Sequence, residues 1–106
     1  MNFPNEIENE RDKLFELCNK YRVIRLFVFG SLLNGNFNSE TSDIDLIVEL
    51  ENLPPVEKGE ILMKFWSELE ELFSRKVDLL TEKSFKNSYL KNEIENSKFL
   101  LYDKAS

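Results

Sequence analysis

Hydrophobic positions alternate along this chain between helical and strand spacing, which predicts an α+β fold. Helices are expected at residues 5–20, from after Pro54-Pro55 to about Phe73, and at residues 85–96, where apolar residues recur on one stripe. Strands are expected at Val23–Phe29, Asp43–Leu50, Lys76–Leu80 and Phe99–Tyr102, which are rich in branched and aromatic residues. A polar loop containing Asn-Gly is expected at residues 34–42, after one helical turn from Ser31. We therefore predict one domain over residues 1–106, with helices packed on a small mixed sheet of about four strands.

Three aspartates are placed together by this arrangement. Asp43 and Asp45 alternate with apolar residues, so on a strand their side chains share one face. The helix at residues 55–73 is long enough to be a crossover, which predicts that the strands before and after it are parallel. Asp45 and Asp78 are each the third residue of a predicted strand, so we expect them at a similar level if the strands are neighbours.

Carboxylates gathered in this way repel one another, and a divalent metal ion removes that penalty. The Gly30-Ser31 turn offers backbone amides and a hydroxyl, which are suited to holding phosphate oxygens. Asp43, Asp45 and Asp78 beside such a turn predict a two-metal site for phosphoryl-type transfer on a nucleotide.

Each feature also has a simpler interpretation. Gly30-Ser31 can be only a strand exit with a helix cap, and each aspartate alone can be a solvated strand position. Trp66 and Cys18 are most simply core residues, and the acidic run from Glu68 to Glu71 is typical of the solvated face of a helix. The ordered combination favours the functional interpretation over these separate ones.

Composition narrows the function class. The 106 residues carry a net charge of −6 and no histidine, which argues against direct nucleic-acid binding and excludes histidine-based zinc sites and bases. One cysteine cannot form an internal disulfide, and no apolar run is long enough for a membrane span, so we expect a cytoplasmic protein. No lysine or arginine occurs from Leu26 to Glu57. Either metal ions compensate the charge of a triphosphate, or basic residues of the carboxy-terminal half or of a partner do so, or the site has lost speed or activity.

The set of Gly30-Ser31, Asp43-Ile44-Asp45 and Asp78 resembles the nucleotidyltransferase superfamily of DNA polymerase beta and kanamycin nucleotidyltransferase. It is most similar to the minimal nucleotidyltransferases (MNT), although the spacer between the first two motifs is one residue longer than is common. The resemblance implies the nucleotidyltransferase fold, phosphate contacts from Gly30 and Ser31, and two Mg²⁺ ions held by Asp43, Asp45 and Asp78. It also implies transfer of a nucleoside monophosphate, AMP from ATP, onto an acceptor hydroxyl, with these three aspartates as the catalytic residues.

The resemblance further implies a partner. MNT proteins pair with helical HEPN-type toxins, and the expected role is that of an antitoxin that modifies a tyrosine of the toxin. Two alternatives stay open: a weakly active or inactive MNT domain that neutralises its partner by binding, and a small-molecule nucleotidyltransferase with a separate helical subunit. Neither nucleic acid nor a membrane is expected as a partner, and a homo-oligomer stays possible.

Overall fold

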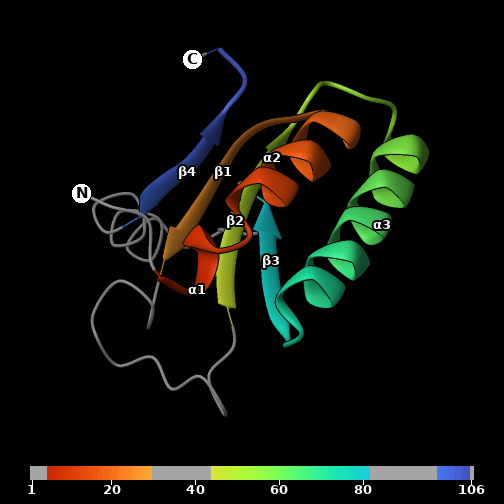
Figure 1. The fold of residues 1–106 in the computed structure, drawn as a ribbon. Helices are drawn as coiled ribbons and strands as arrows, with labels where there is room; N and C mark the ends of the chain where they lie inside the picture. The colour runs from red at the N-terminus through yellow and green to blue at the C-terminus, as the bar shows by residue number, and fades with distance from the viewer. Residues whose placement is uncertain (1–4, 30–43, 82–97, 106) are drawn as a thin grey trace, which may run out of the picture.

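The computed structural model describes residues 5–29, 44–81 and 98–105, and the structural statements below concern these residues (Figure 1). Their elements follow in the order α1 (Asn5–Glu8), α2 (Arg11–Lys20), β1 (Val23–Phe29), β2 (Ile44–Leu50), α3 (Pro55–Phe73), β3 (Val77–Thr81) and β4 (Phe99–Asp103). The predicted loop at residues 34–42 and the predicted helix at residues 85–96 lie outside the described residues. No helix in the described part of the chain is both long and apolar enough to cross a membrane.

The first predicted helix is divided in two. A turn in which the Glu10 amide donates to the Ile7 carbonyl at 3.0 Å separates α1 from α2. Ile7 and Leu14 are both buried, but the positions between them that would continue the stripe, Glu10 and Arg11, are polar. Packing therefore does not hold a continuous helix across Asn9, a weak helix former.

The sheet confirms the predicted mixed topology. Its strand order is β3-β2-β1-β4, with β2 parallel to β3 and β1 antiparallel to both of its neighbours. Helix α3 is the crossover that connects the two parallel strands, as its length predicted. The predicted strand and helix bounds of these elements differ from the observed ones by one residue at most.

The core lies between the sheet and the helical layer that α2 and α3 form (Figure 1). Alternate strand residues face this layer and are buried, as are the inward residues of the helices: Leu26, Val28, Ile44, Leu46, Val48, Val77, Leu79, Leu14, Cys18, Phe65 and Leu69. Because strand side chains alternate, the residues between them occupy the other face of the sheet. The helix-facing side thus holds the fold together, and Asp45 and Asp78 lie among the residues of the other side.

Replacing Leu69 by alanine should lower the free energy of unfolding by about 2–5 kcal/mol, because Leu69 is 0% exposed and its removal leaves a cavity. Met63 lies on the same helix but is 65% exposed, so Met63→Ala should change stability by less than about 0.5 kcal/mol. Urea unfolding of both variants checks this, and equal losses would contradict the assignment of the core.

Burial raises the pKa of the Cys18 thiol from 9.0 to about 12. The thiol therefore stays protonated in the folded chain while it ionises in the unfolded chain above pH 9, so its stabilising contribution is lost as pH rises from 9 toward 12. The stability advantage of the parent over Cys18→Ala should shrink by about 1.4 kcal/mol between pH 8 and pH 10. Urea unfolding of both chains at the two pH values measures it, and a constant difference would contradict the burial of the thiol.

Candidate active site

Asp45 and Asp78 are direct neighbours in the parallel ladder of β2 and β3. The pairs on either side of them, Ile44 with Val77 and Leu46 with Leu79, are buried in the core. Residues that pair in register on parallel strands point to the same face, so both carboxylates lie on the face away from the helical layer. The backbones of neighbouring strands are about 4.8 Å apart, which brings the two carboxylates within reach of one cation. The sequence predicted this common level, and the structure has it.

The other predicted site residues, Gly30, Ser31 and Asp43, lie outside the described residues. Within the three described stretches, no group of three or more metal-ligating side chains is found. Gly30 directly follows β1 and Asp43 directly precedes β2, so both are sequence neighbours of the strands that carry the described part of the site. The described site is thus the pair of Asp45 and Asp78.

Helix α3 fixes the strand that carries Asp78. The indole Nε1–H of Trp66 donates to the Val77 carbonyl at 2.7 Å, and the Val77 amide donates to the Glu70 Oε2 at 3.0 Å. On the other side of the strand, the Ile44 amide donates to the Lys76 carbonyl at 3.1 Å. The backbone immediately before Asp78 is therefore held both by β2 and by α3.

Glu70 thus has a role that the sequence analysis missed. The acidic run was interpreted as the solvated face of α3, but Glu70 is half-buried and accepts a backbone hydrogen bond. Trp66 and Glu70 lie four residues apart, so they share one face of the helix. Their spacing was visible in the sequence, but the strand amide and carbonyl that they satisfy depend on the tertiary arrangement.

The face around the two carboxylates is organised in rows across the strands. Phe29 pairs with Asp45, so the first row is Phe29, Asp45 and Asp78. The next row is apolar, with Phe27 opposite Ile47 and Leu80 beyond them, and Ile47 is only 3% exposed. An apolar row therefore separates the carboxylates from the charged row of Arg25, Glu49 and Asp103.

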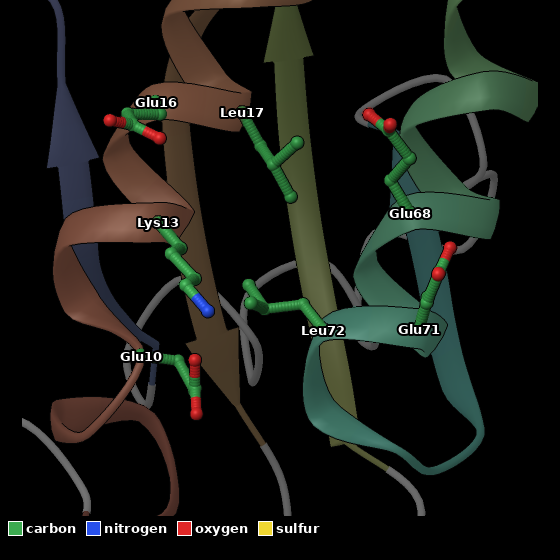
Figure 2. Close-up of a pocket in the computed structure, with 7 residues that line it drawn as sticks. All are labelled: Glu10, Lys13, Glu16, Leu17, Glu68, Glu71 and Leu72. Carbon is green, nitrogen blue, oxygen red and sulfur yellow. The ribbon is translucent and has the colours of Figure 1, made fainter.

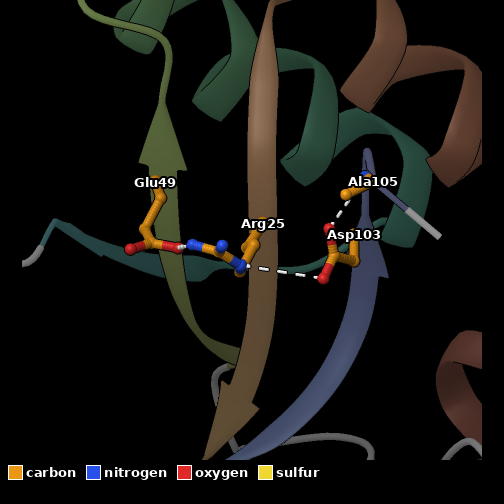
Figure 3. A network of polar contacts seen from close by, with 4 residues as sticks. All are labelled: Arg25, Glu49, Asp103 and Ala105. Atoms are coloured by element: carbon orange, nitrogen blue, oxygen red, sulfur yellow. Dashed lines mark hydrogen bonds and ion pairs between the residues drawn. The ribbon is translucent and has the colours of Figure 1, made fainter.

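The charges of that row pair with one another (Figure 3). Arg25 lies between Glu49 and Asp103, with Nη1 2.8 Å from the Glu49 Oε2 and Nε 3.7 Å from the Asp103 Oδ2. Asp103 also accepts a hydrogen bond from the Ala105 amide at 2.9 Å. Arg25 thus belongs to a charge cluster at the far end of the sheet and does not compensate the carboxylates of Asp45 and Asp78.

A groove of about 480 Å³ lies elsewhere, between α2 and α3 (Figure 2). Its lining combines apolar, acidic and basic side chains: Leu17, Leu72, Glu10, Glu16, Glu68, Glu71 and Lys13. It belongs to the helical layer, whereas Asp45 and Asp78 lie on the opposite face of the sheet. Four carboxylates against one ammonium disfavour a triphosphate in this groove.

Comparison with known proteins assigns the chain to a family. A profile of the nucleotidyltransferase domain matches residues 11–101, and the chain belongs to this family. The chain is 40% identical over 81 residues to MJ1379 of Methanocaldococcus jannaschii, which is assigned as a protein adenylyltransferase. The alignment covers 74% of this chain and 77% of the relative. It is 34% identical over 76 residues to the protein adenylyltransferase MntA of Thermococcus cleftensis, and the alignment covers 72% of this chain and 73% of the relative.

Solved structures agree on the fold. A protein described as a minimal nucleotidyltransferase matches with a TM-score of 0.72 and 25% identity, covering 88% of this chain and 90% of the other. A chain from the structure of a tri-AMPylated HEPN toxin in complex with an MNT antitoxin, from Shewanella oneidensis, matches with a TM-score of 0.56 and 21% identity, covering 92% and 73%. The chain is therefore a nucleotidyltransferase, and the resemblance to the MNT proteins is confirmed.

Enzymes of this family generally use a divalent metal ion. The described residues fit such an ion, because Asp45 and Asp78 present hard carboxylate oxygens from adjacent strand positions on one face. Carboxylates without histidine or thiolate favour Mg²⁺ or Mn²⁺ over zinc.

Replacing Glu70 by alanine should accelerate amide hydrogen exchange at Val77, because that amide loses the carboxylate that accepts its hydrogen bond. Trp66→Phe should lower the free energy of unfolding by about 1–3 kcal/mol, since the part-buried Val77 carbonyl loses its donor. Glu71 lies on the same helix and is exposed, so Glu71→Ala serves as the control with unchanged exchange. Identical Val77 exchange in Glu70→Ala and Glu71→Ala would contradict the role of Glu70.

Proposed function

We propose that this chain transfers AMP from ATP to a hydroxyl group of a partner protein in a Mg²⁺-dependent reaction. The observation that carries the proposal is the in-register pair of Asp45 and Asp78 on the face of the sheet away from the helices. Relatives at 34–40% identity are named protein adenylyltransferases, which supports adenylyl transfer to protein.

In this proposal Asp43 and Asp45 would hold the metal ions, and Asp78 would complete the second metal site and help to activate the acceptor hydroxyl. Gly30 and Ser31 contact the β- and γ-phosphates. When bound, the metal ions neutralise the charge that develops on the transferred phosphoryl group and align the attacking and leaving oxygens.

The reaction balances as a displacement at phosphorus. The acceptor oxygen forms a bond to the α-phosphorus, the bond from that phosphorus to the bridging oxygen of the β-phosphate breaks, and pyrophosphate leaves. The hydroxyl proton passes to a base, and we propose that Asp78 helps to remove it.

We propose a helical HEPN-type toxin as the partner and a tyrosine of that toxin as the acceptor. A structural match is a chain from the complex of a tri-AMPylated HEPN toxin with an MNT antitoxin, which supports this pairing. The chain then acts as the antitoxin of a toxin–antitoxin pair.

The test uses ATP labelled at the α-phosphate. It measures transfer of the label, in the presence of Mg²⁺, to the protein encoded by the gene that neighbours the gene of this chain. Asp45→Asn and Asp78→Asn should each lower the transfer rate by at least about 100-fold, because each removes a charge that supports the transition state. Asp12→Asn removes the same charge from an exposed position on α2 and should leave the rate unchanged.

The outcomes also separate the alternatives. Label on a small molecule and none on protein would replace the protein acceptor by a metabolite. The Asp45→Asn and Asp78→Asn variants can also be tested for protection of a strain that produces the toxin. If they protect it and the parent transfers no label, the chain is an antitoxin that acts by binding and not by catalysis.

A further inference from the structure

The groove between α2 and α3 has an apolar floor. Leu17 of α2 and Leu72 of α3 both line it, and Figure 2 shows their side chains between the two helices. Each leucine packs against the core but is only half-buried, so part of its apolar surface opens into the groove. The volume of about 480 Å³ falls within the range of roughly 300–1,000 Å³ that is usual for binding clefts.

The two walls of this groove carry negative charge that the chain does not neutralise. Glu10 and Glu16 line it from the α2 side, and Glu71 lines it from the α3 side. Among the described residues, none of these three carboxylates has an ion pair or a side-chain hydrogen bond, and Lys13 is in no ion pair with them. The fourth glutamate of the groove, Glu68, lies 3.7 Å from the Nζ of Lys20.

Carboxylates in several other places have partners within the chain. The glutamates concerned are Glu8 with Arg11, Glu49 with Arg25, Glu51 with Lys104, Glu57 with Arg22 and Glu70 with the Val77 amide. The groove therefore combines exposed apolar surface with free negative charge on both sides of it, and this combination favours a cationic ligand with an apolar part.

The spacing of the glutamates indicates the form of that ligand. No three metal-ligating side chains come together in the described stretches, so these carboxylates do not suit one metal ion. Glu68 and Glu71 lie three residues apart on α3, about 4.5 Å along its axis. Lysines or arginines three or four residues apart on a helix have a similar spacing, and an amphipathic helix places an apolar stripe beside them.

We infer that the groove between α2 and α3 binds a basic amphipathic helix of a partner protein. The apolar side chains of that helix pack on Leu17 and Leu72, and its basic residues pair with the glutamates of the two walls, which is the helix-in-groove mode of recognition. A second copy of this chain suits the groove less well, because two copies that each carry a net charge of −6 repel each other.

This surface is separate from the candidate active site. The groove belongs to the helical layer, and Asp45 and Asp78 lie on the opposite face of the sheet. A helix bound in the groove leaves that face open, so the inference does not depend on the proposed function.

The experiment measures binding of a synthetic peptide to the full chain by fluorescence anisotropy. The probe is a labelled peptide of about four helical turns, with leucines on one stripe and lysines beside it. The control peptide has the same composition in an order that forms no apolar stripe. The amphipathic peptide should bind about 10-fold more tightly than the control peptide, because only the first presents apolar and basic groups together.

Variants of the chain locate the binding surface. The double variant Glu16→Gln and Glu71→Gln removes one free carboxylate from each wall and should weaken binding of the amphipathic peptide about 3- to 10-fold. The matched control, Asp12→Asn with Glu60→Gln, removes the same charge from exposed positions on the same two helices outside the groove. Its affinity should stay within about twofold of the parent.

Equal affinities of the groove variant and the matched control would overturn the inference, as would equal binding of the two peptides or no binding to the parent. Thermal unfolding shows whether each variant keeps the fold, and Glu71→Gln alone serves where the double variant does not. A chain that transfers AMP but binds no peptide would retain the proposed function and reject the groove. A chain that binds the peptide in the groove but transfers no AMP would do the reverse.

Discussion

The register between β2 and β3 is the constraint on which the site depends. A shift of one residue in β3 would turn Asp78 into the core and move Val77 and Leu79 to the other face. Both apolar residues are buried, so the hydrophobic effect opposes this slip. The bonds from Trp66 and Glu70 to Val77 act in the same direction, because they satisfy backbone groups that a slipped strand would present differently. The position of Asp78 beside Asp45 is therefore set by the core and by α3 together.

The two faces of the sheet differ: one packs against the helices and forms the core, and the other carries Asp45 and Asp78. The helix-facing side is apolar across all four strands, and it supports two adjacent carboxylates on the other side whose mutual repulsion opposes folding. Such a pair is tolerated where the rest of the strand is firmly held and where a cation compensates the charge. The apolar row of Phe27, Ile47 and Leu80 keeps the Arg25 cluster from supplying that cation.

Much of the fold could be predicted because the spacing of apolar residues along the chain indicates helices and strands directly. Strand β1 was predicted at its observed bounds and helix α3 within one residue of them, and the length of α3 predicted the parallel pairing. The division of the first helix at Asn9 was missed, because Ile7 and Leu14 fit one stripe whether or not the helix continues between them. The level of Asp45 and Asp78 followed from counting along two strands. The roles of Glu70 and Trp66 did not, because each depends on how α3 packs against β3 in the folded chain.

The distribution of charge explains why the site depends on a few cations at defined points. The chain has an excess of six negative charges, and several of its described basic residues are paired with carboxylates: Arg22 with Glu57, Lys20 with Glu68, Lys104 with Glu51 and Arg25 with Glu49. These pairs lie away from Asp45 and Asp78, so they lessen the overall repulsion of an anion but do not hold it in place. Orientation of a triphosphate for attack at its α-phosphorus requires fixed charges on both sides of the reacting group. In the proposed function, metal ions held by Asp45 and Asp78 would supply fixed positive charge on one side of that group, so an acidic domain could position an anionic substrate.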